Sequence, residues 1–106
     1  RAMTQTLHKL LVGDALTAGS RATLIEWLKA NTTGDKRLRA GVPADWAIGE
    51  KTGTNRTDAN DIGIAWPASG RPPLIITAYL AESTASSAVK EATLAGVARL
   101  AASLVG

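Results

Sequence analysis

The stretch Trp46–Ala81, WAIGEKTGTNRTDANDIGIAWPASGRPPLIITAYLA, decides the fold of this chain. It contains three runs, WAIGEKTGT, IGIAW and LIITAYLA, whose β-branched and aromatic residues favour extended strands. The segments between them, TNRTDAND and PASGRPP, are rich in the Asn, Asp, Gly and Pro residues that form turns. Because both connections are short, consecutive strands are expected to pair side by side in opposite directions. The stretch therefore predicts a three-stranded antiparallel meander.

Helical patterns precede and follow this meander. Residues 3–12, 20–30 and 86–104 place apolar side chains at the spacing of one helical face. Ser20 is expected to cap the second helix, and residues 31–45, rich in Asn, Thr, Gly and Pro, are expected to form a loop. The order is thus α-α-β-β-β-α, and the predicted fold class is an α/β sandwich with an antiparallel sheet flanked by helices. The apolar positions of the three helices are Met3, Leu7, Leu10 and Leu11, then Leu24, Ile25 and Leu28, then Val89, Ala92, Val97, Leu100 and Leu104.

Apolar side chains exceed what a chain of this size is expected to cover by itself. The run LIITAYL reads as a strand covered on both faces, and the last helix offers apolar residues on more than one side. Trp27, Trp46 and Trp66 are expected to be core residues, because their spread does not form a stacking platform. The pattern predicts that a further piece of protein packs on this chain.

Composition excludes several classes of function. The chain has 106 residues, of which 45% are hydrophobic and 20% charged, as in a single small globular domain. The net charge of +3 is spread without a basic stripe, and no run reaches the roughly 18–20 apolar residues of a membrane span. Neither a nucleic acid nor a membrane is therefore an expected partner. Cys is absent and His8 is the single histidine, so no metal centre is predicted.

The end of the first predicted strand, Lys51-Thr52-Gly53-Thr54, combines an ammonium group, two hydroxyls and a glycine. Side chains alternate along a strand, so Lys51 and Gly53 fall on one face and the two threonines on the other. At a sheet edge, such a strand can pair with an extended ligand that carries a carboxylate, and the Thr54 N–H can donate to a developing oxyanion. The alternative is a plain amphipathic strand with a surface lysine and turn threonines.

The context of these four residues resembles the class A β-lactamases, which belong to the penicillin-recognising serine acyl-transferases. Lys-Thr-Gly is one of three motifs of that family, and here it stands within VPADWAIGEKTGT at the family's spacing. NDIGIAWP, GRPPLIITAYL and the Ala-rich last helix extend the resemblance over essentially the whole chain. The chain is thus identified as the C-terminal portion of one catalytic domain. Residues 1–45 would be its helical part and loop, 46–82 its meander, and 83–106 its last helix.

The resemblance implies a role for each residue of the strand. Lys51 would lie beside the nucleophile and attract the substrate carboxylate, which Thr52 and the Thr54 hydroxyl would hydrogen-bond. The Thr54 N–H would be one of two oxyanion-hole donors, so Lys51 and Thr54 are the implied catalytic groups. Gly53 would keep the strand open to the ligand. The arginine that many members carry on the next strand is absent, and Arg37 matches the position that supplies the guanidinium in others.

The family's nucleophile motif Ser-x-x-Lys, its Ser-Asp-Asn loop and its glutamate loop do not stand before Lys-Thr-Gly in this sequence. The string Ser87-Ala88-Val89-Lys90 has the first pattern, but it lies after the strands, where Lys90 is expected to point to solvent. The resemblance therefore implies an enzyme that hydrolyses β-lactams through an acyl-enzyme, without a cofactor, once a missing N-terminal segment brings these motifs. This chain alone is expected to be inactive.

The implied partners are a β-lactam and that N-terminal segment, in a monomeric, periplasmic or secreted bacterial parent enzyme. Two alternatives stay open. One is a fragment of a penicillin-binding D,D-peptidase, which shares Lys-Thr-Gly but deacylates slowly. The other is a non-enzymatic module whose exposed edge strand binds a peptide or a carboxylate.

Overall fold

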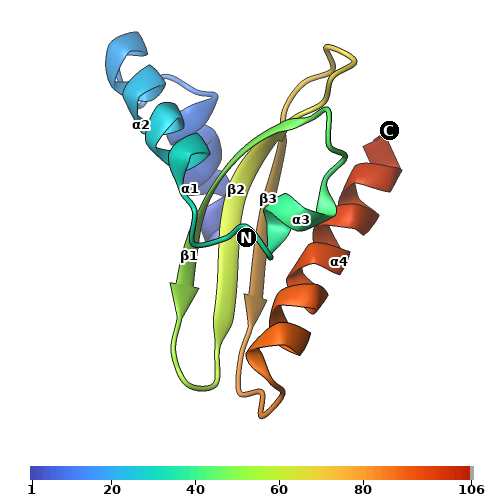
Figure 1. Cartoon of the computed structure of the whole chain (residues 1–106). Helices are drawn as coiled ribbons and strands as arrows, with labels where there is room; N and C mark the ends of the chain where they lie inside the picture. The colour runs from blue at the N-terminus through green and yellow to red at the C-terminus, as the bar shows by residue number, and fades with distance from the viewer. Residues whose placement is uncertain (106) are drawn as a thin grey trace.

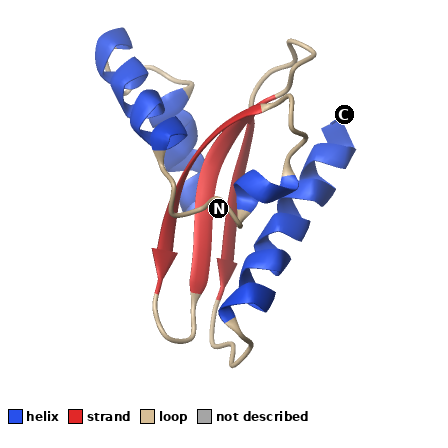
Figure 2. Cartoon of the chain, in the orientation of Figure 1, coloured by secondary structure: helices blue, strands red, loops and turns tan. Residues whose placement is uncertain are grey.

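The computed structural model describes residues 1–105 and confirms the predicted α/β sandwich (Figure 1). Helices α1 and α2 cover one face of the sheet, and α3 and α4 cover the other (Figure 2). The elements are α1 (Ala2–Leu11), α2 (Ala18–Ala30), α3 (Leu38–Gly41), β1 (Ala47–Thr54), β2 (Ala59–Trp66), β3 (Leu74–Leu80) and α4 (Ser87–Val105).

The sheet has the strand order β1-β2-β3, and both neighbouring pairs are antiparallel, as predicted. β1 pairs with β2 along its whole length, and Thr54 lies opposite Ala59. β2 thus begins earlier than predicted, because the hairpin is shorter than the turn-forming residues indicate. The Asn55 side chain closes this hairpin: its Oδ1 accepts hydrogen bonds from the N–H groups of Thr57 at 3.0 Å and Asp58 at 2.8 Å.

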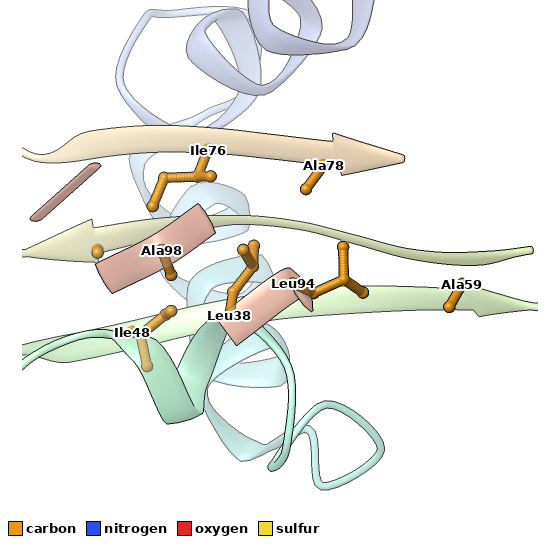
Figure 3. Close-up of a cluster of buried hydrophobic side chains, with 8 residues drawn as sticks. Leu38, Ile48, Ala59, Ile76, Ala78, Leu94 and Ala98 are labelled. Carbon is orange, nitrogen blue, oxygen red and sulfur yellow. The ribbon is translucent and has the colours of Figure 1, made fainter. Parts of the chain in front are cut away.

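Each face of the sheet has its own apolar core. Leu7, Leu11 and Ile64 form the core under α1 and α2. On β3, Ile75 packs against this core, whereas Ile76 faces the opposite way, so β3 has apolar contacts on both faces. Tyr79 is nevertheless 55% exposed, so the described residues do not cover the whole strand as predicted. The core under α3 and α4, shown in Figure 3, consists of Leu38, Ile48, Ala59, Ala65, Ile76, Ala78, Leu94 and Ala98.

Two local predictions in the N-terminal half were wrong. The N-cap of α2 is Thr17 rather than Ser20, because the Thr17 hydroxyl accepts a hydrogen bond from the Ser20 N–H at 3.2 Å. The predicted loop contains the one-turn helix α3, whose first residue, Leu38, is fully buried. Its backbone N–H donates to Oδ2 of Asp61 at 3.1 Å. Asp61 lies on β2, so the first N–H group of α3 is satisfied by a residue remote in the sequence.

The predicted apolar stripe of the last helix faces away from the sheet, so this prediction of the buried face was wrong. Val97, Leu100 and Leu104 are 41%, 65% and 82% exposed. The side of α4 that faces the sheet carries mainly small residues, which let α3 approach closely, and a side chain at Gly41 would clash with the Ala95 carbonyl. The buried residues of α4 are Lys90, Leu94, Ala95, Ala98 and Ala102.

Trp27 on α2 is 69% exposed, which contradicts its expected core position, whereas Trp46 and Trp66 are half-buried. Exposed apolar side chains therefore lie on both helical layers, on Trp27 of one and on Leu104 of the other. Among residues 1–105, no helix combines the length and the apolar character that a membrane crossing requires.

Candidate active site

β1 lies at one edge of the sheet and pairs with β2 alone among the described strands (Figure 1). Next to this pair, the Asn55 N–H donates to the Asp58 carbonyl at 3.1 Å, in the same register as Thr54 opposite Ala59. Hydrogen-bonded and non-hydrogen-bonded pairs alternate along an antiparallel ladder. The N–H of Thr54 and the carbonyl of Thr52 therefore point to the unpaired edge, where a ligand can reach them.

Lys51 lies on this open edge strand with its side chain exposed. Its Nζ donates to the Thr52 carbonyl at 2.7 Å, which holds the ammonium group near the unpaired edge. The strand alternates as predicted. Gly49, on the same face as Lys51, packs against Leu28 of α2, whereas Ile48, on the same face as Thr52, belongs to the core under α4.

The two threonines of the strand differ in their surroundings. Thr52 is half-buried, and its Oγ1 lies 2.6 Å from Oγ1 of Thr33 in the loop after α2. Thr54 is exposed at the end of β1, and no described residue hydrogen-bonds its hydroxyl. Sequence reasoning missed Thr33, since nothing local to its segment indicates a contact with β1. Thr52 is therefore oriented by the protein, while the Thr54 hydroxyl is available to a ligand.

Gly53 is not required by packing within this chain. A Cβ built at this position would meet only the Asn60 side chain, at an ordinary contact distance of 3.8 Å. By contrast, a Cβ at Gly49 would lie 2.9 Å from Cβ of Leu28. The described chain thus explains the glycine at position 49 but leaves the one at position 53 without a structural reason.

Arg37 is buried, with 6% of its surface exposed, and the protein fixes its guanidinium. Its Nη1 donates to the Asn60 carbonyl at 2.9 Å, and its Nε forms an ion pair with Glu91 at 3.4 Å. Arg37 and Thr54 line the same small pocket of about 160 Å³. The structure therefore brings the predicted guanidinium close to the end of the Lys-Thr-Gly strand.

Two buried carboxyl groups lie on neighbouring strands, Glu50 on β1 and Asp61 on β2. The sequence alone did not identify this pair. Glu50 and Asp61 are fully buried on the face under α3. Asn31 donates to Oε1 of Glu50 at 2.9 Å and Arg39 does so at 3.3 Å, whereas Oε2 of Glu50 and Oδ1 of Asp61 have no described partner. Burial, together with the neighbouring Glu50, raises the pKa of Asp61 to about 8. The pair thus holds a proton at neutral pH.

Lys90 is buried rather than solvated, which overturns the expectation that it points to solvent. Only 6% of its surface is exposed, and its Nζ donates to the Arg56 carbonyl at 3.3 Å. Ser87 begins α4 at the same pocket as Lys90, but neither lies on the open edge of β1. Among the described residues, no group of three or more His, Asp or Glu side chains is placed to hold a metal ion.

Comparisons with known proteins agree with this geometry. A sequence profile described as "Beta-lactamase enzyme family" matches residues 1–105. The chain is 47% identical over 103 residues to the "Carbapenem-hydrolyzing beta-lactamase KPC" of Klebsiella oxytoca, a match that covers 95% of this chain and 35% of that protein. It is 42% identical to a "Beta-lactamase" of Streptomyces albus G, a match that covers 100% of this chain and 34% of that protein.

Solved structures give the same result. An "Ancestral (GNCA) Beta-lactamase class A" superposes with a TM-score of 0.93 at 51% identity, covering 97% of this chain and 40% of that one. A β-lactamase from Xanthomonas campestris gives a TM-score of 0.94 at 50% identity, covering 99% and 40%. This chain belongs to the β-lactamase enzyme family, in its class A. It spans about a third of the length of the curated relatives that it matches.

Proposed function

We propose that this chain is the C-terminal, substrate-binding portion of a serine β-lactamase, which hydrolyses β-lactams through an acyl-enzyme. The observation that carries the proposal is the open edge of β1, where the outward N–H of Thr54 stands next to an ammonium group and two hydroxyls. An extended ligand can lie along this edge and form main-chain hydrogen bonds. Membership of the β-lactamase family indicates the reaction, and the open edge of β1 has the geometry that this reaction requires.

Each residue at this edge is proposed to have a role that follows from its chemistry. Thr52 and the Thr54 hydroxyl hydrogen-bond the substrate carboxylate, and Lys51 and Arg37 attract it by charge. When a serine attacks the lactam carbonyl, negative charge develops on its oxygen, and the Thr54 N–H is one of two donors that stabilise it. Lys51 also stands beside the nucleophile, where its positive charge favours a deprotonated neighbour. Gly53 lets the ligand approach the backbone.

The nucleophile and its bases come from a further segment of the same enzyme. That segment carries Ser-x-x-Lys, the Ser-Asp-Asn loop and the glutamate that activates the deacylating water. Its places of contact are the unpaired edge of β3 and the exposed apolar side chains of α4, such as Leu100 and Leu104. The complete enzyme is proposed to be a monomer that acts outside the bacterial cytoplasm on β-lactams, without a cofactor.

Complementation tests the proposal. The chain is mixed with a class A segment that carries the three absent motifs but lacks Lys-Thr-Gly, and hydrolysis of a chromogenic cephalosporin is followed. The mixture is expected to turn over the cephalosporin, and each part alone is not. A mixture containing Lys51→Ala should associate equally well but lose turnover. A complex that forms without any hydrolysis would contradict the proposal.

The open edge also favours a second candidate, a module that binds a peptide or a carboxylate without chemistry. In that case a carboxylate-bearing peptide would bind to the chain alone, and complementation would add no turnover. A D,D-peptidase would instead form a long-lived acyl-enzyme with the cephalosporin, which mass spectrometry of the complemented mixture would detect as a stable adduct.

A further inference from the structure

A series of hydrogen bonds runs from a buried carboxylate to the Thr52 hydroxyl on the open edge strand. Nδ2 of Asn31 donates to Oε1 of Glu50 at 2.9 Å, and Oδ1 of Asn31 accepts from the Thr33 hydroxyl at 2.9 Å. Oγ1 of Thr33 lies 2.6 Å from Oγ1 of Thr52. The series thus connects the interior of the protein to a hydroxyl that the proposed function assigns to the substrate carboxylate.

The buried end of this series has a fixed direction. Glu50 is fully buried, and its Oε1 also accepts from the Arg39 guanidinium at 3.3 Å. An oxygen that accepts from a cation faces the NH₂ group of an amide and not its oxygen, since two acceptors repel each other. The Asn31 amide oxygen therefore points away from Glu50 and toward Thr33. A Cβ at Gly34 would clash with the Glu50 carboxylate, so the loop after α2 lies directly against this buried group.

The number of available protons fixes the direction of the exposed end. A threonine hydroxyl has one proton to donate. Because Oδ1 of Asn31 can only accept, the Thr33 proton lies on the bond to Asn31. The contact between Thr33 and Thr52 then needs the Thr52 proton, so Thr52 donates to Thr33 in the absence of a ligand. In this arrangement Thr52 offers only lone pairs to a ligand, and lone pairs repel a carboxylate.

A hydrogen bond from Thr52 to a carboxylate requires both hydroxyls to turn, since two sets of lone pairs cannot face each other at 2.6 Å. Thr52 then donates to the ligand, and Thr33 donates to Thr52 in place of Asn31. The Asn31 oxygen keeps a donor through this change, because it also accepts from the Thr33 backbone N–H at 3.4 Å. Two hydrogen bonds in series that point toward an anion polarise each other, which strengthens the bond to the ligand.

We propose that Thr33 is a positioning residue, whose hydroxyl reverses together with that of Thr52 between a ligand-free arrangement and one that holds a carboxylate. Thr33 acts on the ligand through Thr52, so it sets the preference for carboxylate-bearing substrates and not the rate of the chemical step. This role rests on the proposed function for its ligand, the β-lactam carboxylate, whereas the ligand-free arrangement is a property of this chain.

The ligand-free arrangement is tested by neutron diffraction from crystals of the chain in D₂O, in which the deuterons of hydroxyl groups are located directly. We expect the Thr33 deuteron to lie toward Asn31 and the Thr52 deuteron to lie toward Thr33. A Thr33 deuteron that lies toward Thr52 would overturn the proposal. The measurement requires neither a variant nor turnover.

Matched variants in the complemented enzyme test the arrangement that holds the carboxylate. Thr33→Val removes the hydroxyl and should raise KM for a carboxylate-bearing cephalosporin about threefold to tenfold, with kcat little changed, as expected for one hydrogen bond. Thr33→Ser restores the hydroxyl and should return KM close to its original value. Thr32→Val changes an exposed neighbour in the same loop and should leave KM unchanged. Equal KM values for Thr33→Val and Thr32→Val would remove the role of Thr33.

A double-mutant cycle separates action through Thr52 from a general change in the loop. In a Thr52→Val background, Thr33→Val should not alter KM further, because the hydroxyl through which Thr33 acts is absent. Additive effects would show that Thr33 acts by another route and would contradict the proposal. The two proposals fail separately. The expected deuteron positions without any turnover in the complemented mixture would count against the lactamase and keep the ligand-free arrangement, whereas turnover with a Thr33 deuteron toward Thr52 would do the reverse.

Discussion

Helices cover both faces of the β-sheet, but the two faces bury different kinds of side chain. Under α1 and α2 the buried side chains are apolar, with Leu7, Leu11 and Ile64 at the centre. Under α3 and α4 the apolar core is accompanied by four buried charged residues, Arg37, Glu50, Asp61 and Lys90. The face under α1 and α2 therefore mainly stabilises the fold, whereas the face under α3 and α4 also positions charge near the end of the Lys-Thr-Gly strand.

The largest expected effect comes from the apolar face. Ile64 is 1% exposed, and Ile64→Ala removes packing from a close-packed core and leaves a cavity. We expect the free energy of unfolding to fall by about 2–5 kcal/mol in urea titrations. Leu94→Ala, at a residue 2% exposed in the other core, is the matched variant and should cost a similar amount. A much smaller loss of unfolding free energy for Leu94→Ala would show that the face under α3 and α4 does not rely on apolar packing.

The second expected effect is a difference in KM between variants of the two arginines near the end of β1. Arg37 is fixed by Asn60 and Glu91, whereas Arg56 is exposed. In the complemented enzyme, Arg37→Ala should raise KM for a carboxylate-bearing cephalosporin by about tenfold or more, since hydrogen bonds to charged groups contribute about 1.5–3 kcal/mol. Arg56→Ala should change KM less than threefold. Equal small effects would mean that Arg37 serves the structure and not the substrate.

The third effect is a pH dependence of the free energy of unfolding, which arises from Asp61 on the sheet face under α3 and α4. The pKa of Asp61 is raised from 3.8 to about 8, so between these values the folded chain holds a proton that the unfolded chain has released. Stability is therefore fully present below about pH 4 and is lost as the pH rises through about 8, by at most about 1.4 kcal/mol per pH unit. Thermal denaturation across pH 5–8 measures this slope. Asp61→Asn, which cannot ionise, should flatten it, and equal slopes in both proteins would refute the raised pKa of Asp61.

The alternation of β1 and its place in a meander could be predicted from the sequence, because both depend on local patterns. WAIGEKTGT alone places Lys51 and Thr52 on opposite faces, as the structure has them. Features that depend on remote partners could not be predicted. The Leu38 N–H at the start of α3 donates to the Asp61 carboxylate on β2, and the buried Lys90 donates to the Arg56 carbonyl, 34 residues earlier.

The buried face of α4 could not be predicted for a related reason. Spacing alone cannot distinguish a stripe of Val97, Leu100 and Leu104 from a stripe of Ala95, Ala98 and Ala102, since both recur at helical intervals. The sheet face is already filled by Leu38 and other large side chains, so the small residues turn inward. The large residues Val97, Leu100 and Leu104 remain exposed.

The smallest expected effect on stability concerns the two glycines of β1, and it isolates the ligand-binding edge. At Gly49 an added Cβ would lie 2.9 Å from Leu28, so Gly49→Ala should cost about 1–3 kcal/mol through overpacking. At Gly53 the nearest atom is 3.8 Å away, so Gly53→Ala should change the free energy of unfolding by less than about 0.5 kcal/mol. Turnover in the complemented enzyme should nevertheless fall with Gly53→Ala, because the methyl group occupies space that the ligand needs. If Gly53→Ala is neutral for both stability and turnover, close approach of a ligand to this strand is refuted, since packing gives no other reason for the glycine.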